Sequence, residues 1–495
     1  MVKKMTITKT KKKFAFDVIW TLGSSIIILI LHFFQKPIIA RYLGPEGFGL
    51  FSMAIIIGDI SQIIASFGIN SALVKFVAEH KENKSKVSSL FSSAFFTILI
   101  IGVITSIVLF VFSDALASIF NMSSLSLLLK IYASALPFML AHGVIISLLM
   151  GLREMRYFAF IRILGAFLAL MLILAFLMIG FGVKGAMLGT VLAVIVAVGV
   201  AIVIVKKIVH FTLSDYGKNT KILASFGSRL VSASMIGYIY TYVDTLMIGY
   251  FLTSTDVGYY ETATSLSRFF WLVPNAIGIV AYPAISEYWA KKDIRAINKL
   301  VDKTTKYSSC ILIFAGMVVI FFAKDIISFI FTSEFLPAVL PLSILIIGTV
   351  TSGTLRSLGS IFASVGRPDL TLKVTAIVSV GNALLNACLI PCYGIVGAAT
   401  ATTAARVLFV IIAVYLIRKV VAIKFDTFWF IKIGTLVGIS VMLFYVFSFL
   451  NHYFSSTIAL FLYVVAVIKY LLTKEDRNYF INIIKHIIHG GSMIE

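Results

Sequence analysis

Several charged side chains lie inside long apolar stretches of the sequence, where they could hold a polar ligand, pair with one another or titrate. The cations are Arg229, Arg268, Arg356, Arg406 and Lys432, and the acids include Asp59 and Asp244. A charge inside a bilayer is costly, so such groups usually face a cavity or a partner. Because a guanidinium presents a planar fork of N–H donors that matches phosphate oxygens, the arginines predict contacts with an anionic group.

Arg268 and Arg406 lie deepest in their apolar stretches. Arg268, in SLSRFFWLVPNAIG, is expected to be a cavity cation that holds an anionic group; the alternative is an interhelical pair with Asp59 or Asp244. Arg406 lies among small residues in GAATATTAARVLF. Small residues favour close helix packing, so either a cavity role or a packing role is open for Arg406.

Arg229 and Arg356 are expected about two helical turns from the cytoplasmic ends of their spans. A long side chain at that depth can extend to the membrane surface, so these arginines either do this or contact a substrate from the inward side. Lys432 is expected only to extend to the surface.

The two acids leave alternatives open. Asp59, in AIIIGDISQII, is expected in the middle of a span, where it either couples transport to an ion or pairs with an embedded arginine. Asp244, in YTYVDTLMIG, is expected towards the outer end of a span, where it is a second ion-coupling or ion-pair candidate or is simply hydrated.

The sequence contains no pattern that predicts a metal site or a cofactor site. Cys310, Cys388 and Cys392 have no His or acidic neighbours at metal-ligand spacing, so we interpret them as small hydrophobic residues. His32 and His142 are interpreted as hydrogen-bonded core residues. No phosphate-binding loop of the G-x-x-x-x-G-K-[ST] type is present. We therefore expect no metal, no cofactor and no ATP hydrolysis.

The composition defines the elements that must position these residues. The chain has 495 residues, of which 60% are hydrophobic and 13% charged, whereas about 25% are charged in a soluble protein. Its net charge of +21 is divided into short clusters between apolar runs, which indicates a membrane protein and no nucleic-acid partner.

The apolar runs predict an all-α polytopic membrane protein with fourteen spans, because a helix of about 20 apolar residues crosses the hydrocarbon core. The predicted spans are 14–35, 46–68, 88–113, 125–150, 157–181, 184–205, 222–250, 256–283, 307–331, 336–364, 370–391, 394–417, 428–449 and 453–473.

Most basic residues fall on one side of this arrangement. With the N-terminus inside, the outer side receives only Lys36, Arg41, Lys130, Lys184 and Lys324. Apart from the five embedded cations, the remaining Lys and Arg lie on the cytoplasmic side, as the positive-inside rule requires. Both termini are therefore expected in the cytoplasm, and the chain in the plasma or inner membrane as a multi-pass protein.

An internal repeat divides the chain. RYLGPEGFGLFSMA at 41–54 aligns without gaps on YFLTSTDVGYYETA at 250–263, and FGVKGA at 181–186 aligns on YGIVGA at 393–398 at nearly the same separation. Each pair enters the membrane in one direction, which predicts parallel six-helix halves at 1–210 and 211–425. Residues 426–495 add two helices and a cytoplasmic tail. Transporters with this repeat bind substrate between the halves, near the midplane.

IIARYLGPEGFGLFSMA and DVGYYETATSLSRFFWLVPNAIGIVAYPAISE, at 256–287, resemble two recurring blocks of the polysaccharide-biosynthesis flippases, Wzx-type members of the multidrug, oligosaccharidyl-lipid and polysaccharide (MOP) exporter superfamily. The resemblance covers nearly the whole chain. It implies a MATE-like fold and translocation of a polyprenyl-(pyro)phosphate-linked oligosaccharide by alternating access through a cationic central cavity, with glycan-assembly proteins as partners. A cavity arginine in the eighth helix, here Arg268, is also typical of the family.

Two other classes compete with this interpretation. A cation-coupled drug or metabolite antiporter of the same superfamily would be expected to carry more embedded acids than cations, and this chain has the reverse. A membrane polysaccharide polymerase or ligase would need a large outer loop, and the predicted outer loops are short. We therefore expect a transporter and not an enzyme. A scramblase or channel without alternating access stays open, as do the sugar, the lipid carrier, the coupling ion and the oligomeric state.

Overall fold

The structure is a computed structural model that describes residues 2–477 apart from 422, 424, 448, 450, 474 and 475, and the regular secondary structure in this part of the chain is helical. No strand occurs among these residues, which confirms the all-α class. Ten helices are long and apolar enough to cross a membrane, or eleven if the bent pair Tyr216–Val231 and Met235–Phe251 counts as one span. The protein is therefore a multi-pass membrane protein. The predicted tail beyond residue 477 lies outside the described residues.

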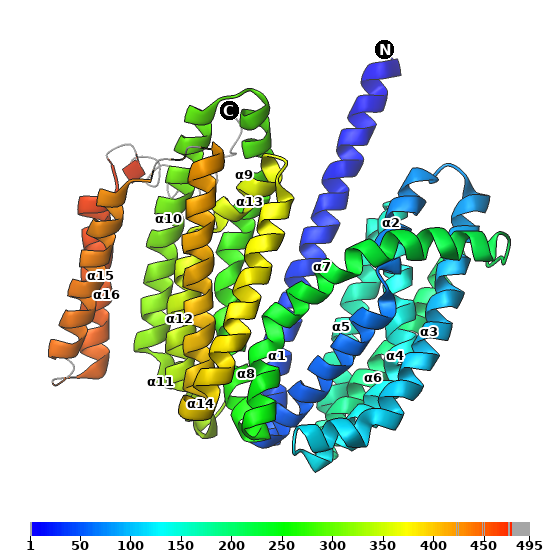
Figure 1. Ribbon diagram of the computed structural model, residues 1–495, viewed down its shortest axis with the longest axis horizontal. Coiled ribbons are helices and arrows are strands. Elements are labelled where there is room, and N and C mark those ends of the chain that lie inside the picture. The colour runs from blue at the N-terminus through cyan, green and yellow to red at the C-terminus, as the bar shows by residue number, and fades with distance from the viewer. Residues whose placement is uncertain are drawn as a thin grey trace. The chain divides into compact units, whose positions relative to one another are not determined.

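The chain divides into two compact units, and each is described by itself (Figure 1). Unit 1 comprises Met1–Thr262, Ile330–Pro337 and Ala383–Ala398. Its helices are α1 (Val2–Ser66), α2 (Ile69–Glu79), α3 (Lys84–Ile119), α4 (Ser123–Leu152), α5 (Met155–Met178), α6 (Gly182–Val205), α7 (Tyr216–Phe251) and the first part of α8 (Ser254–Arg268). Within this unit, α7 packs against α1, α2 and α3.

Unit 2 comprises Ala263–Phe329, Ala338–Asn382 and Ala399–Glu495. After the end of α8, its elements begin with the 3-10 turn η1 (Phe269–Trp271), α9 (Leu272–Ala290), α10 (Ile294–Phe321) and α11 (Ala323–Ile330). The 3-10 turn η2 (Ser333–Ala338), α12 (Val339–Thr354), α13 (Arg356–Ser364) and α14 (Pro368–Val421) follow. α15 (Thr427–Phe447), α16 (His452–Ala466) and the π-helical turn η3 (Val467–Leu471) complete it. The middle of α14 belongs to unit 1.

Each unit has its own apolar core. In unit 1 the core joins α2, α3, α4 and α6, with Phe91 and Leu148 completely buried at its centre. In unit 2 one cluster joins α9, α10, α13 and α14, and a second joins α10 to α15 and α16 around Trp429 and Tyr463. Apolar side chains on the remaining helix faces are exposed, as expected where lipid replaces water.

Two helices that begin in loops start at a side-chain cap. α3 begins where the Asn83 side chain accepts a hydrogen bond from the Lys86 amide at 3.0 Å, and α10 begins where the Asp293 side chain accepts one from the Ala296 amide at 2.9 Å.

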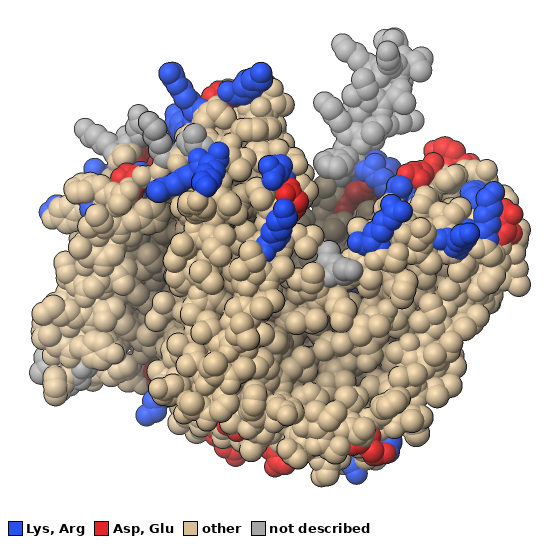
Figure 2. Space-filling view, viewed as in Figure 1, with Lys and Arg blue, Asp and Glu red and all other residues tan. Residues whose placement is uncertain are grey.

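On the face shown in Figure 2, Lys and Arg side chains gather at one end of the helices in each unit, and the surface between the helix ends is almost free of charge. That distribution suits helices that cross a bilayer.

Two long helices contain a sharp break at a glycine. Gly44 in α1 has φ 66° and ψ 179°, and Gly394 in α14 has φ 58° and ψ −141°. A side chain at a positive φ is strained, so glycine is the residue that such a break requires. Gly182, which the repeat matches to Gly394, also has a positive φ, of 57°. The second pair of repeated segments thus shares a positive φ at its matched glycines.

The first pair of repeated segments lies in contact within unit 1. A Cβ on Gly49 would meet the backbone of Ser254 and Gly258, and a Cβ on Gly258 would meet the backbone of Pro45. Glycine at both positions therefore allows α1 and α8 to approach at backbone distance just after the Gly44 break.

Candidate functional site

Asp59 is held by two tyrosines in unit 1. The Tyr132 hydroxyl of α4 donates to one carboxylate oxygen at 2.8 Å, and the Tyr238 hydroxyl of α7 donates to the other at 3.1 Å. Tyr132 is completely buried against Gly58, where a Cβ would overlap its ring. No ion pair of Asp59 occurs among the described residues. The acid is therefore compensated there by hydroxyl donors and not by an arginine.

A second acidic cluster joins α7, α8 and α1 within unit 1. Asp244, only 5% exposed, accepts a hydrogen bond from the Tyr260 hydroxyl at 2.5 Å. The neighbouring Thr245 hydroxyl donates to Glu261 at 3.3 Å, and Glu261 forms an ion pair with Lys36 at 3.1 Å. Glu261 is only 2% exposed. The sequence analysis did not single out this acid, because it follows two tyrosines in a polar stretch and lacks an apolar flank.

Arg406 is used in helix packing within unit 2. Its guanidinium donates to the Leu345 carbonyl at 3.2 Å and to the Thr349 hydroxyl at 2.5 Å, which ties α14 to α12. Nearby, the Thr403 hydroxyl donates to the Ile344 carbonyl at 2.8 Å. These contacts correspond to the packing alternative that the small residues around Arg406 suggested.

Arg268 and Arg356 both lie where helices of unit 2 are interrupted. Arg268 is the last residue of α8, directly before η1, and Arg356 begins α13 after α12 has ended at Thr354. The Arg356 guanidinium lies 5.8 Å from the ring centre of Trp271, the last residue of η1. The fold therefore brings the break after Arg268 and the break at Arg356 together around Trp271.

The other two predicted cations, Arg229 and Lys432, are described each within its own unit. Arg229 is exposed on α7 and makes no hydrogen bond or ion pair with the described residues. Lys432 lies over the Phe428 ring at 4.6 Å, one turn into α15, as a side chain extending to the membrane surface would.

Arg162 is a cation that the sequence analysis assigned to the cytoplasmic side. In the structure it lies about two turns into α5 and is partly buried. His32 of α1 and His142 of α4 are within electrostatic range of Arg162. The predicted span 157–181 already contains Arg162 and the apolar run YFAFI before it, so the span boundary, and not the charge assignment, agrees with the structure.

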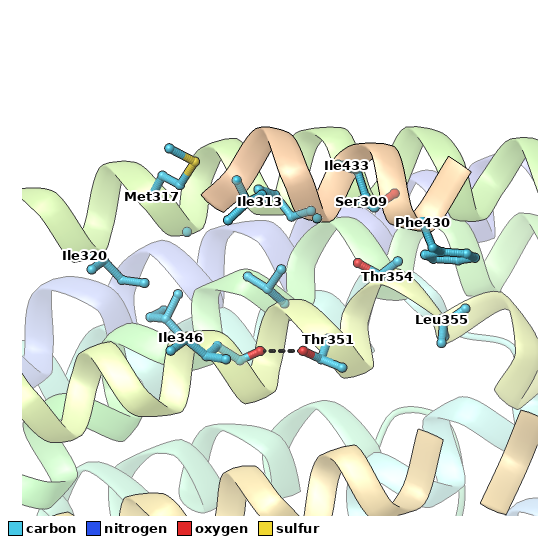
Figure 3. A pocket seen from close by; sticks show the side chains of 15 residues that line it. Ser309, Ile313, Met317, Ile320, Ile346, Thr351, Thr354, Leu355, Phe430 and Ile433 are labelled. Carbon is cyan, nitrogen blue, oxygen red and sulfur yellow. Dashed lines mark hydrogen bonds between the residues drawn. The ribbon is translucent and has the colours of Figure 1, made fainter. Parts of the chain in front are cut away.

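One cavity of unit 2 has no charged side chain in its wall. It has a volume of about 450 Å³ and lies between α10, α12 and α15 (Figure 3). Ile313, Met317 and Ile346 contribute to the lining, and the hydroxyl of Thr351 donates to the Ile347 carbonyl of its own helix. Such a lining suits hydrocarbon and not a phosphate or a sugar, so this cavity is not the polar site. Among the described residues, no group of three or more His, Cys, Asp or Glu could hold a metal ion.

Solved structures with the same fold define the class of protein. The lipid II flippase MurJ in an inward closed conformation superposes with a TM-score of 0.74 at 18% identity, over 92% of this chain and 100% of that one. An inward-facing multidrug resistance MATE family transporter of the MOP superfamily matches with a TM-score of 0.65 at 15% identity, over 80% and 94%. The fold is thus that of MurJ and the MATE transporters.

The polysaccharide biosynthesis protein family model matches residues 14–289, and the chain belongs to this family. The lipid II flippase MurJ model matches residues 269–468. A probable low-salt glycan biosynthesis flippase of Haloferax volcanii is 30% identical over 42% of this chain and 44% of its own length. A membrane protein of Methanocaldococcus jannaschii is 26% identical over 87% and 88%. A putative O-antigen transporter of Shigella flexneri is 21% identical over 58% and 69%. The relatives named by activity are flippases and transporters, not enzymes.

Proposed function

We propose that the protein is a flippase that moves a polyprenyl-(pyro)phosphate-linked oligosaccharide from the cytoplasmic to the outer leaflet of the plasma or inner membrane, for the assembly of surface polysaccharide or glycan. The observation that carries the proposal is membership of the polysaccharide biosynthesis family over residues 14–289. The relatives from Haloferax volcanii and Shigella flexneri, named a flippase and an O-antigen transporter, add support.

The substrate headgroup is anionic, and the embedded arginines are the groups suited to it. We assign the first contact to Arg268 and Arg356, because both lie at helix breaks around Trp271. Freed backbone groups at such breaks are tolerated in a membrane protein only where they are buried or line a polar cavity. Arg229 is proposed as a contact from the cytoplasmic side, and Arg406 as a supporting residue whose main role is to join α12 to α14.

The proposed topology has fourteen crossings with both termini in the cytoplasm. The breaks at Gly44 and Gly394 divide α1 and α14 into two segments each, and every segment falls on a predicted span. Labelling of single cysteines should find positions 75–86, 206–221 and 291–306 in the cytoplasm and 114–124 outside. Positions 75–86 and 291–306 on opposite faces would contradict both the count and the parallel repeat.

Alternating access is the proposed transport mechanism. MATE transporters of the MOP superfamily have been solved in inward-facing and outward-facing conformations, and this chain matches the two with TM-scores of 0.65 and 0.55. With no nucleotide site in the sequence, the driving force would be a substrate gradient, the membrane potential or a coupled ion. One charge moved through 100 mV yields about 2.3 kcal/mol. Asp59 and Asp244 are the proposed ion-coupling candidates.

The test is translocation of a fluorescent polyprenyl-diphosphate saccharide in reconstituted vesicles. Arg268→Ala should lose most of the activity at normal protein yield, and Arg268→Lys should recover only part of it, because lysine lacks the planar fork. Lys432→Ala is the matched control, a cation of the same unit at a membrane surface, and should transport normally. Normal transport by Arg268→Ala would remove Arg268 from the site.

A cation-coupled antiporter is the competing function, and three acids favour it: Asp59, which is partly buried, and Asp244 and Glu261, which are buried. The same vesicles distinguish the two. An antiporter would exchange an organic cation for H⁺ or Na⁺ and would leave the saccharide lipid in its original leaflet.

A further inference from the structure

A short segment between α11 and α12 packs as part of unit 1, although the chain on both sides of it belongs to unit 2. Residues 330–337, here called the outer clasp, comprise the last residue of α11 and most of η2. Phe329 before the clasp and Ala338 after it fall in unit 2. The proposed topology places the clasp on the outer side of the membrane. A movement of α11 or α12 relative to unit 1 would therefore pull on it.

An aromatic side chain fixes the clasp within unit 1. The Phe335 ring is completely buried, and its centre lies 6.3 Å from the Phe48 ring of α1 and 6.3 Å from the Tyr259 ring of α8. Both contacts are edge-to-face, which is a favourable arrangement of aromatic rings. The buried Phe331 ring of the clasp lies 5.6 Å from Phe335. Phe335 thus anchors the clasp to both blocks of the first repeat.

Two charged side chains join the clasp to α1 in opposite directions. The Arg41 guanidinium of α1 donates a hydrogen bond at 2.9 Å to the carbonyl of Ile330, the last residue of α11. The Glu334 carboxylate of the clasp lies beside the Gly44 break, where a Cβ would be 3.5 Å from its Oε2 atom. The second segment of α1 starts at this break. A cation at the end of one helix and an anion at the start of another both stabilise the helix dipoles.

The contacts of the clasp are suited to opening and closing. Arg41 and Glu334 are exposed, so breaking their contacts leaves no charge buried in the membrane. The Thr332 hydroxyl is buried and has no hydrogen-bond partner in the described structure. A buried hydroxyl without a partner carries an unfavourable desolvation cost, which exposure to water removes. The closed clasp is therefore held by Phe335 and the two charged contacts, and the Thr332 hydroxyl opposes it.

We propose that the outer clasp is a gate element, which is seated on α1 and α8 in this conformation and leaves them when the transport pathway opens to the outside. The inference rests on the proposed function and deepens it by naming the segment that opens. Phe335 forms the apolar part of the latch, and Arg41 and Glu334 form its polar part. Because the chain runs from the clasp directly into α11 and α12, a movement of these helices is transmitted to the latch.

Cysteine accessibility in the reconstituted vesicles tests the gate during transport. The background is the full-length protein with Ser in place of Cys310, Cys388 and Cys392. A membrane-impermeant maleimide added outside should label Phe335→Cys slowly at rest and severalfold faster while the saccharide lipid is being transported. Leu125→Cys, completely buried at the start of α4, is the matched control and should stay unreactive in both conditions. Ser333→Cys, exposed on the clasp, should react equally fast in both.

Removal of the polar part of the latch tests the gate without a substrate. Arg41→Ala should raise the resting labelling rate of Phe335→Cys about threefold or more, because a hydrogen bond of ordinary strength no longer favours the closed clasp. Arg41→Lys should recover part of the difference, since lysine is also a donor and a cation. Lys184→Ala, which removes an exposed cation near the start of α6, is the control and should leave the rate unchanged.

The outcomes distinguish the gate from the proposed function. If Phe335→Cys stays unreactive while the same vesicles transport, the clasp does not open and the gate is overturned, whereas the function stands. Unchanged resting labelling in Arg41→Ala would also contradict the latch. If the vesicles move no saccharide lipid, the proposed function fails, and the Arg41→Ala measurement still decides on the clasp. Should Phe335→Cys not fold, Phe331→Cys, at the other buried ring of the clasp, gives the same measurement.

Discussion

Gly49 and Gly258, which the internal repeat matches to each other, lie face to face within unit 1. A Cβ on Gly49 would come within 2.8 Å of the Gly258 amide nitrogen, and a Cβ on Gly258 would overlap the Pro45 carbonyl. The two repeated blocks therefore pack backbone to backbone where α1 restarts after Gly44 and α8 begins.

Alanine at this contact should lower stability. Gly49→Ala forces two backbones apart, and overpacking of this kind costs about 1–3 kcal/mol. The melting temperature of the purified protein measures the effect. Gly199→Ala in α6, where a Cβ meets nothing within 4 Å, is the control and should leave the melting temperature unchanged or slightly raised. Equal melting temperatures for the two variants would show that the contact tolerates a methyl group.

Arg406→Ala should act mainly on stability. The substitution removes hydrogen bonds from a charged group to Leu345 and Thr349, which are worth about 1.5–3 kcal/mol each. We expect a lower melting temperature and yield, with transport per folded molecule reduced less than in Arg268→Ala. A variant with normal stability and abolished transport would instead make Arg406 a substrate contact.

The variant Asp59→Asn distinguishes an ion-coupling role of Asp59 from a structural role. If Asp59 couples transport to an ion, the variant should fold and lose the dependence of transport on the pH or ion gradient. If Asp59 is structural, yield and melting temperature should fall. Tyr238→Phe, which removes one hydrogen bond to the acid, is the companion variant and should cost about 1 kcal/mol of stability. Normal transport by Asp59→Asn with unchanged ion dependence would leave the membrane potential or the substrate gradient as the driving force.

The attachment of α15 to α10 should weaken in acid. Lys306 donates a hydrogen bond to Asp426 at 2.9 Å, and this holds the pKa of Asp426 below its ordinary value of 3.8. A lowered pKa in the folded state stabilises the protein above pH 3.8, and the contribution is lost as the pH falls through the folded-state pKa. Because the pair is partly exposed, the loss should stay below about 1 kcal/mol.

Melting temperatures of the unsubstituted protein and Asp426→Asn, recorded from pH 6 to pH 3, measure this contribution. The difference between them should be constant above pH 5 and shrink below pH 4. A difference that does not depend on pH would exclude the ion pair as its cause.

The apolar runs were sufficient to predict a helical membrane protein, because crossing a hydrocarbon layer requires long helices whatever their neighbours are. The glycine-rich repeats also marked positions whose backbone is special, such as Gly182 and Gly394, since a positive φ is a local requirement for glycine. Such features follow from the chemistry of a few adjacent residues.

The partners of the embedded charges depended on the tertiary structure. Asp59 was expected to pair with an arginine if it was structural, but its hydrogen-bond partners in the described part of the fold are Tyr132 and Tyr238, 73 and 179 residues away. Glu261 pairs with Lys36, which is 225 residues away. A membrane helix is apolar on nearly every face, so periodicity does not reveal which face meets another helix. Only the packing of distant spans brings these partners together.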